Sequence, residues 1–192
     1  VRFDAVPVGK LLGQMASAQN AMNLVILDAC RNNPFARSFR AANQGLAEAQ
    51  HNVGMLYYHG YGVRQNYRAA HKWFNLAAQQ DLPDAQYMLG LSYYLGKGTS
   101  QDYTLARSWF YKSAKQAYGN AQMMLAYMLQ AGDGGNPQPE LAIVWALLAE
   151  KNGISDARDI AYHAELMLNE QQMSLANKLV EKCLSSNLKE CT

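Results

Sequence analysis

Residues 49–78 read AQHNVGMLYYHGYGVRQNYRAAHKWFNLAA, and the same pattern returns twice later in the chain. Residues 85–114 read AQYMLGLSYYLGKGTSQDYTLARSWFYKSA, and residues 121–150 read AQMMLAYMLQAGDGGNPQPELAIVWALLAE. An Ala-Gln dipeptide, a pair of glycines and a tryptophan thus recur every 36 residues. Three independent markers that share one spacing indicate a stacked array of supersecondary units, which usually presents a continuous surface to a partner. The markers are Ala49, Ala85 and Ala121, then Gly60, Gly96 and Gly132, then Trp73, Trp109 and Trp145.

Each repeat is predicted to form two helices joined by a glycine turn. In the first repeat, Ala49, Val53 and Tyr57 follow one another at steps of four, which places them on one face of a helix. Gly60 and Gly62 then end that helix, because glycine adopts left-handed backbone conformations that other residues avoid. We expect the second helix of each repeat to follow this turn.

Capping residues mark where the second helices begin. Asn66 and Asp102 carry the short polar side chains preferred at an N-cap. The third repeat has Gln138, a weaker cap, followed by Pro139 at a first-turn position where proline is tolerated. Each second helix then carries its tryptophan among small residues, so we expect the three tryptophans to fill the core between the helices.

The residues around the markers repeat as well. In the first two repeats they include Tyr57-Tyr58, Asn66-Tyr67, Ala70, Trp73-Phe74 and Ala77-Ala78, then Tyr93-Tyr94, Asp102-Tyr103, Ala106 and Trp109-Phe110. This pattern closely resembles the Sel-one-like repeat family, a relative of the tetratricopeptide repeats, over about residues 44–152. The resemblance implies an all-α, right-handed solenoid of antiparallel helix pairs. It also implies an adaptor role, often in bacterial envelope, secretion or host-interaction systems.

Residues 153–192 are expected to form a degenerate fourth unit and a terminal cap. Residues 154–168 read as an amphipathic helix without a tryptophan marker. Asn169 and Gln172 then have the spacing of a capping box, which predicts a last helix that continues to Leu184. Such a helix would give the array the polar outer face that its end requires.

The three cysteines do not indicate a disulfide framework or a zinc site. Cys183 and Cys191 could pair only if the tail folds back, because eight residues of continuous helix would separate them by about 12 Å. We therefore do not expect this bridge. Cys30 lies far away in the sequence, and no Cys/His spacing matches a zinc site.

Residues 1–43 are expected to lie outside the period. A helix-like stretch, residues 8–21, precedes an apolar run that reads as a buried strand and ends in Asp28-Ala-Cys30, and residues 31–35 read as a loop. The string from 23 to 35 with Arg37-Ser-Phe-Arg40 resembles the end of the large subunit of a caspase-like, metacaspase-type peptidase. That resemblance implies that Cys30 is the thiol nucleophile and that Asp28 lies near a pocket for a basic substrate residue.

The peptidase resemblance is incomplete in its chemistry. A thiol nucleophile needs a base, and no histidine precedes Cys30. All four histidines lie in the array or its cap, so we expect residues 1–43 to be a non-catalytic peptidase fragment. This segment either pairs as a strand or turns helical and covers the exposed end of the first repeat, and we prefer the helical cover.

Composition excludes several function classes. Residues 1–46 carry five basic and two acidic side chains and residues 47–192 carry twelve and thirteen, so neither part has the basic stripe of a nucleic-acid binder. No apolar run approaches the roughly 20 residues that cross a bilayer. The glycine pairs follow no strand and recur in phase, so we expect no phosphate site, and we expect no metal or other cofactor.

The leading hypothesis is a non-catalytic scaffold that binds a protein or peptide partner. In related arrays the first helices line the concave face, where aromatic and methionine side chains suit an adaptable groove. The alternatives are a caspase-like cysteine peptidase, or an inactive remnant of one, with a regulatory array, and a structural module that self-associates. The resemblance also suggests a soluble, bacterial periplasmic or secreted protein. The candidate partner-binding residues are His51, Met55, Tyr58, Tyr87, Leu91, Tyr94, Met123 and Tyr127.

Overall fold

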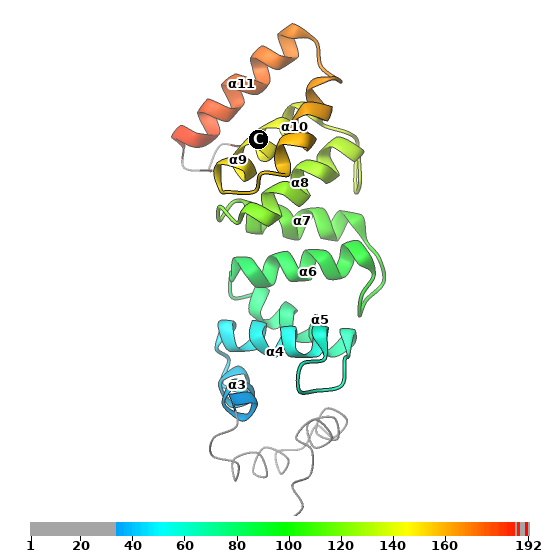
Figure 1. Ribbon diagram of the computed structural model, residues 1–192, viewed down its shortest axis with the longest axis vertical. Coiled ribbons are helices and arrows are strands. Elements are labelled where there is room, and N and C mark those ends of the chain that lie inside the picture. The colour runs from blue at the N-terminus through cyan, green and yellow to red at the C-terminus, as the bar shows by residue number, and fades with distance from the viewer. Residues whose placement is uncertain (1–33, 187, 189–190, 192) are drawn as a thin grey trace, which may run out of the picture. The chain divides into compact units, whose positions relative to one another are not determined.

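The computed structural model describes residues 34–186, 188 and 191, and within them the chain is entirely helical (Figure 1). Nine α-helices and no strand occur in this described part. The expected all-α solenoid of helix pairs is therefore confirmed. The helix expected at 8–21, the expected strand, Asp28 and Cys30 all lie outside the described residues.

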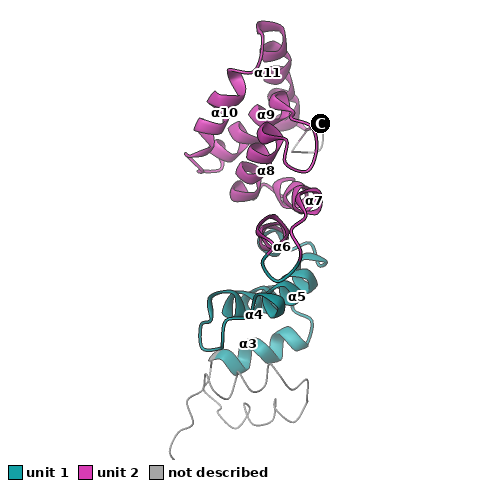
Figure 2. Cartoon of the chain, turned by 90° about the vertical axis from the view of Figure 1, so that its right-hand side faces the viewer, with its two compact units in different colours: residues 1–85, 97–99 teal, residues 86–96, 100–192 magenta. Residues whose placement is uncertain are grey.

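The chain forms two compact units, which are drawn in different colours in Figure 2. The described part of unit 1 contains α3 (Pro34–Asn43), α4 (Ala47–His59), α5 (Tyr67–Ala78), the first turn of α6 (Pro83–Leu95) and residues 97–99. Unit 2 contains the rest of α6, α7 (Tyr103–Ala114), α8 (Gly119–Ala131), α9 (Pro139–Lys151), α10 (Ala157–Glu165) and α11 (Glu170–Ser185).

The turns and caps form as the sequence predicts. Gly60 ends α4 in the left-handed conformation, with φ of 78°, and its N–H donates to the Leu56 carbonyl at 2.8 Å. The Asn66 side chain then accepts the Ala69 N–H at 3.0 Å and starts α5. Asp102 caps α7 in the same way, whereas Gln138 makes no side-chain cap and α9 begins at Pro139. The helix pairs are thus set by local sequence.

Helix α3 occupies the position of a second helix from a preceding repeat, so the expectation that residues 1–43 lie outside the period is wrong for 34–43. The Ala42 carbonyl accepts the Gln50 side-chain amide at 3.2 Å, as the Ala114 carbonyl accepts that of Gln122 at 3.1 Å. Residues 34 and 35 of the expected loop belong instead to a helix that begins at Pro34, because proline fits the first helical turn. A left-handed residue also follows each second helix at the same spacing: Gly45, Asp81, Ala117 and Gly153.

Phenylalanine, not tryptophan, fills the core of the first two repeats. Phe74 and Phe110 are fully buried, whereas Trp73 and Trp109 are only half-buried, which corrects the expectation from sequence. The reason is that a glycine on the facing helix makes room for the phenylalanine ring. A Cβ atom added at Gly54 would lie 2.5 Å from the Phe74 ring.

The second and third repeats show how this pairing changes. A Cβ atom added at Gly90 would lie 2.7 Å from the Phe110 ring. In the third repeat the two equivalent positions are Ala126 and Ala146, and there Trp145 is buried, with 1% of its surface exposed. The larger ring enters the core only where both members of the glycine–phenylalanine pair are alanine.

The glutamine of each Ala-Gln marker is a buried hydrogen-bonding residue. Its side-chain oxygen accepts an amide N–H from a residue 30 positions later, just after the second helix of the same repeat. A buried amide needs such partners, because an unpaired polar group costs free energy in the core. The three pairs are Gln50 with Gln80 at 2.8 Å, Gln86 with Gln116 at 2.9 Å, and Gln122 with Asn152 at 2.7 Å.

The C-terminal cap contains a disulfide that the sequence argument did not expect. Cys183 and Cys191 are bonded, and their Cα atoms lie 4.5 Å apart. The continuous helix assumed from the sequence ends instead at Ser185, and the chain turns back through Leu188, whose φ is 64°. The Leu188 N–H donates to the Cys183 carbonyl at 2.9 Å.

The capping box of Asn169 and Gln172 forms as expected, while α10 is shorter than the helix expected over 154–168.

Replacing Cys183 and Cys191 together by alanine should destabilise this cap by about 2.5 kcal/mol. The disulfide restricts the unfolded chain by closing a short loop, and without it the unfolded state regains that entropy. Urea unfolding of oxidised wild type and the double variant measures the difference. Reduced wild type is the control, because it should unfold with the double variant. Equal stability of oxidised and reduced wild type would contradict the prediction.

Candidate partner-binding surface

The eight residues predicted to bind a partner lie on α4, α6 and α8, the first helices of the three repeats. His51, Met55 and Tyr58 belong to unit 1, and the other five belong to unit 2. Seven are half-buried, and only Tyr127, with 43% of its surface exposed, is open to solvent. Most of these side chains therefore also contribute to packing within their unit.

Tyr58 is fixed at the end of α4 by its neighbours. Its ring centre lies 5.3 Å from that of Tyr67, at the start of α5, and 6.3 Å from that of Phe74. The Gln65 side-chain amide donates both to the Tyr58 carbonyl at 2.9 Å and to the Tyr67 hydroxyl at 3.0 Å. The two tyrosines and the glutamine together close the turn between the helices.

A lysine of the following turn reaches these two tyrosines. The Lys97 Nζ atom lies 5.2 Å from the ring centres of both Tyr58 and Tyr67, and it donates to the Tyr58 hydroxyl at 3.2 Å. That hydrogen bond raises the pKa of Lys97 and keeps its ammonium group charged. Unit 1 thus holds a cation against a pair of aromatic rings.

His51 is the least satisfied polar side chain of the predicted set. Its ring centre lies 5.7 Å from that of Phe74, and its Nδ1 atom is buried without a hydrogen-bond partner in the described part of the chain. Burial lowers the pKa of His51, although the Asp84 carboxylate acts in the opposite direction. The imidazole is therefore neutral at pH 7.

Tyr94 repeats the geometry of Tyr58 with a different partner. Its ring centre lies 5.2 Å from that of Tyr103, and the Gln101 amide donates to the Tyr94 carbonyl at 2.8 Å and to the Tyr103 hydroxyl at 3.1 Å. The Tyr94 hydroxyl, however, donates to the Asp133 carboxylate at 3.3 Å. Burial raises the pKa of Tyr94 most, and Tyr127 and Asp133 raise it further.

Four of the predicted residues in unit 2 pack against its hydrophobic core. Tyr87 contacts Phe110 and Tyr118, with ring centres 5.7 and 5.3 Å apart. Leu91, Tyr94 and Met123 also lie against the core. A partner would meet only the solvent-facing edges of these four side chains. Tyr127, the fifth predicted residue in unit 2, has the most surface to offer.

Three consecutive Sel1 repeats are recognised in the chain, at residues 47–82, 83–118 and 119–154. They cover more than half of its 192 residues. The chain belongs to the Sel1 repeat family. Their bounds place each repeat's first helix, glycine turn and second helix together, as the structure does. No similar sequence is found among curated proteins.

Two solved structures resemble this Sel1 repeat chain. One is c5321, a protective antigen of uropathogenic Escherichia coli strains with an SLR fold, at 26% identity and a TM-score of 0.74. The other is a Sel1 repeat protein from Oxalobacter formigenes, at 31% identity and a TM-score of 0.61. The matches cover 91% and 72% of this chain but only 35% and 58% of the two larger proteins.

The residues that distinguish the two tyrosine pairs of this Sel1 repeat chain were missed from the sequence. Lys97 and Asp133 occupy the middle of equivalent Gly-X-Gly turns, 36 residues apart. Gln65 and Gln101, which hold the tyrosine pairs, are equivalent in the same way. Aligning the repeats and looking for charge at one position would have found Lys97 and Asp133.

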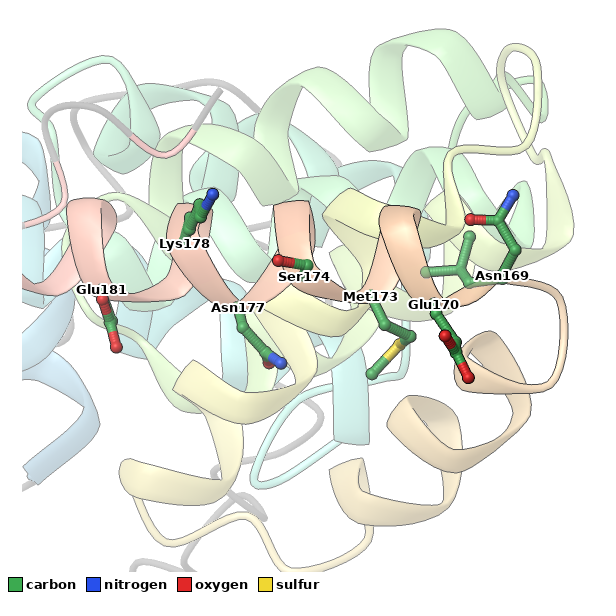
Figure 3. Close-up of a pocket in the computed structure, with 8 residues that line it drawn as sticks. Asn169, Glu170, Met173, Ser174, Asn177, Lys178 and Glu181 are labelled. Atoms are coloured by element: carbon green, nitrogen blue, oxygen red, sulfur yellow. The ribbon is translucent and has the colours of Figure 1, made fainter.

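Other features of the described residues give little indication of chemistry. They contain no group of three His, Cys, Asp or Glu side chains placed to hold a metal ion, and none of their helices has the length and apolar character needed to cross a membrane. An open pocket runs along α11, where Glu170, Met173, Asn177 and Glu181 line it (Figure 3). Its residues are mostly polar, and none was a predicted site residue.

Proposed function

We propose that this Sel1 repeat chain is a non-catalytic scaffold that binds a protein or peptide partner through side chains on its first helices. Proteins built from Sel1 repeats typically mediate protein interactions, and three such repeats make up most of the described chain. The observation that carries the proposal is the exposed Tyr127 on α8, beside a turn that presents Asp133. Tyrosine suits this role because it buries a large area on binding while losing little conformational freedom.

A peptide library displayed on phage and selected against the full chain tests the proposal. Tyr127→Ala should weaken the selected peptides about tenfold or more, the effect typical of truncating a tyrosine anchor. Tyr162→Ala is the matched control, because Tyr162 is 57% exposed on α10, outside the proposed surface. Failure to select any specific peptide, or equal loss in both variants, would contradict the proposal.

The two alternatives each have a direct test. A thiol-reactive probe that labels Cys30 rapidly, together with cleavage of Arg/Lys peptides that is lost in Cys30→Ala, would replace the scaffold by the peptidase hypothesis. An apparent molar mass from light scattering that rises with protein concentration would instead support self-association of the array.

We further propose that the chain folds in an oxidising compartment, such as the bacterial periplasm or the exterior. The buried Cys183–Cys191 disulfide supports this, since such bonds persist where thiols are not kept reduced. Mass spectrometry of a non-reducing digest of protein from its native source checks it. Finding both cysteines as free thiols would contradict it.

A further inference from the structure

Two equivalent tyrosine pairs in this chain differ in the charge that they meet. Tyr58 and Tyr67 in the first repeat correspond to Tyr94 and Tyr103 in the second, each 36 residues later. Both pairs are held at nearly the same ring separation, 5.3 and 5.2 Å, by an equivalent glutamine. The scaffold of the pair is therefore the same in both repeats.

In unit 1 the tyrosine pair is an occupied ammonium site. The Lys97 Nζ atom lies over both rings and donates to the Tyr58 hydroxyl. An ammonium ion is attracted to the electron-rich face of an aromatic ring, and the hydroxyl oxygen accepts one of its three N–H bonds. The chain thus shows which ligand this tyrosine pair binds.

Among the described residues of unit 2, none places an ammonium group on the equivalent pair. The residue at the position of Lys97 is Asp133, and its carboxylate accepts a hydrogen bond from Tyr94. Arg107 approaches the nearby Gly135, but no ion pair joins it to Asp133, and within the described chain Asp133 has no cationic partner. The second tyrosine pair therefore has a carboxylate beside it, and no described residue supplies the ammonium group that the carboxylate could neutralise.

The rings of this second site are open to a partner. Tyr103 has 37% of its surface exposed and Tyr127 has 43%. Tyr127 also interacts with the Tyr94 side chain, which places a third aromatic side chain beside the pair. Three aromatic side chains and one carboxylate form the combination that proteins use to bind ammonium groups.

We infer that Tyr94, Tyr103, Tyr127 and Asp133 form a receptor for a lysine side chain of the partner protein. The inference rests on the proposed scaffold function and names the chemistry of what it binds. The ammonium group lies against the tyrosine rings, as Lys97 does in unit 1, and Asp133 neutralises its charge. An acidic side chain would be repelled by Asp133, and a neutral one would leave the carboxylate without a counter-ion.

NMR titration of the full chain with the peptide acetyl-Gly-Gly-Lys-Gly-Gly-amide tests the inference. The amide signals of Tyr94, Tyr103 and Asp133 should shift, and the same peptide with Nζ-acetyl-lysine or norleucine should bind about tenfold more weakly or not at all, because it lacks the charge. Equal shifts with the neutral peptides would overturn the inference. Equal or tighter binding of the same peptide with arginine in place of lysine would overturn the assignment to lysine.

Two substitutions exchange the two sites. Asp133→Lys places an ammonium group where Lys97 lies in the first repeat, so it should abolish binding of the lysine peptide while the melting temperature stays close to that of wild type. Lys97→Asp vacates the first site, so it should add shifts at Tyr58 and Tyr67. Undiminished lysine binding in Asp133→Lys would overturn the inference. If peptides selected by phage display still bind that variant, the lysine site fails while the scaffold function stands.

Discussion

Replacing Phe110 by alanine should lower the free energy of unfolding of unit 2 by about 3–5 kcal/mol, the range for truncating a fully buried phenylalanine. The ring is completely buried and lies against Gly90, so its removal leaves a cavity that the facing helix cannot fill. Urea unfolding followed by tryptophan fluorescence measures the change. The slope of the transition should be checked, because repeat arrays can lose cooperativity when one repeat is weakened.

Trp109→Ala is the matched control for this prediction. Trp109 is the larger ring and immediately precedes Phe110 in the chain, but it is half-buried, and the Lys112 Nζ atom lies 3.8 Å from its ring centre. Its truncation should therefore cost less than that of Phe110. A larger loss in Trp109→Ala would restore the role that sequence alone assigned to the tryptophan.

A second substitution tests why phenylalanine is in the core. Gly90→Ala alone should destabilise the unit, because its new Cβ atom would lie 2.7 Å from the Phe110 ring. Combined with Phe110→Ala, the same methyl group should instead fill part of the cavity, since the equivalent positions of the third repeat are both buried alanines, Ala126 and Ala146. The double variant should thus lose less unfolding free energy than the sum of the losses in the two single variants. Additive losses would contradict direct contact between the two positions.

The features that sequence predicted well are those that depend on residues close together in the chain. The N-caps at Asn66 and Asp102, the capping box at Asn169 and the left-handed glycine at Gly60 all formed as expected. Each involves a hydrogen bond or backbone conformation within a few residues. The 36-residue period then fixed the order of the helices.

The features that sequence missed depend on which face of a helix meets its neighbour. Trp109 and Phe110 are adjacent, and one residue turns a helix by about 100°, so only one of the two rings could enter the core. Trp109 was the residue that marked the repeat in the sequence, but Gly90 on the facing helix makes room for the Phe110 ring. Helix α3 was missed for a related reason, since Ala42 and Gly45 keep the period without a tryptophan.

The candidate site was predicted as a type of surface, and its chemistry came from the structure. Tyr58 and Tyr94 were identified as equivalent tyrosines on the first helices, but their hydroxyl groups meet opposite charges, Lys97 and Asp133. Those contacts join residues 39 positions apart. No local pattern reports such a contact, although the repeat alignment places the two charged residues at one position.

The contact between Asp133 and Tyr94 depends on the glycine that follows Asp133, and this leads to the second large effect. Gly134 has a φ of 76°, and a Cβ atom there would lie 2.6 Å from the Tyr103 carbonyl oxygen. Gly134→Ala should therefore destabilise unit 2 by about 2–4 kcal/mol, since it combines a left-handed alanine with a clash against backbone that cannot move freely.

Gly153→Ala separates the two causes of this loss. Gly153 also has a positive φ, of 89°, but nothing lies within 4 Å of an added Cβ atom, so only the backbone strain of about 1–2 kcal/mol should appear. The excess loss in Gly134→Ala then measures the contact between the turn and the start of α7. Because that contact holds Asp133 beside Tyr94, Gly134→Ala should also weaken lysine-peptide binding, and Gly153→Ala should leave it unchanged. Equal unfolding free energies for the two variants would show that the turn does not press on Tyr103 in solution.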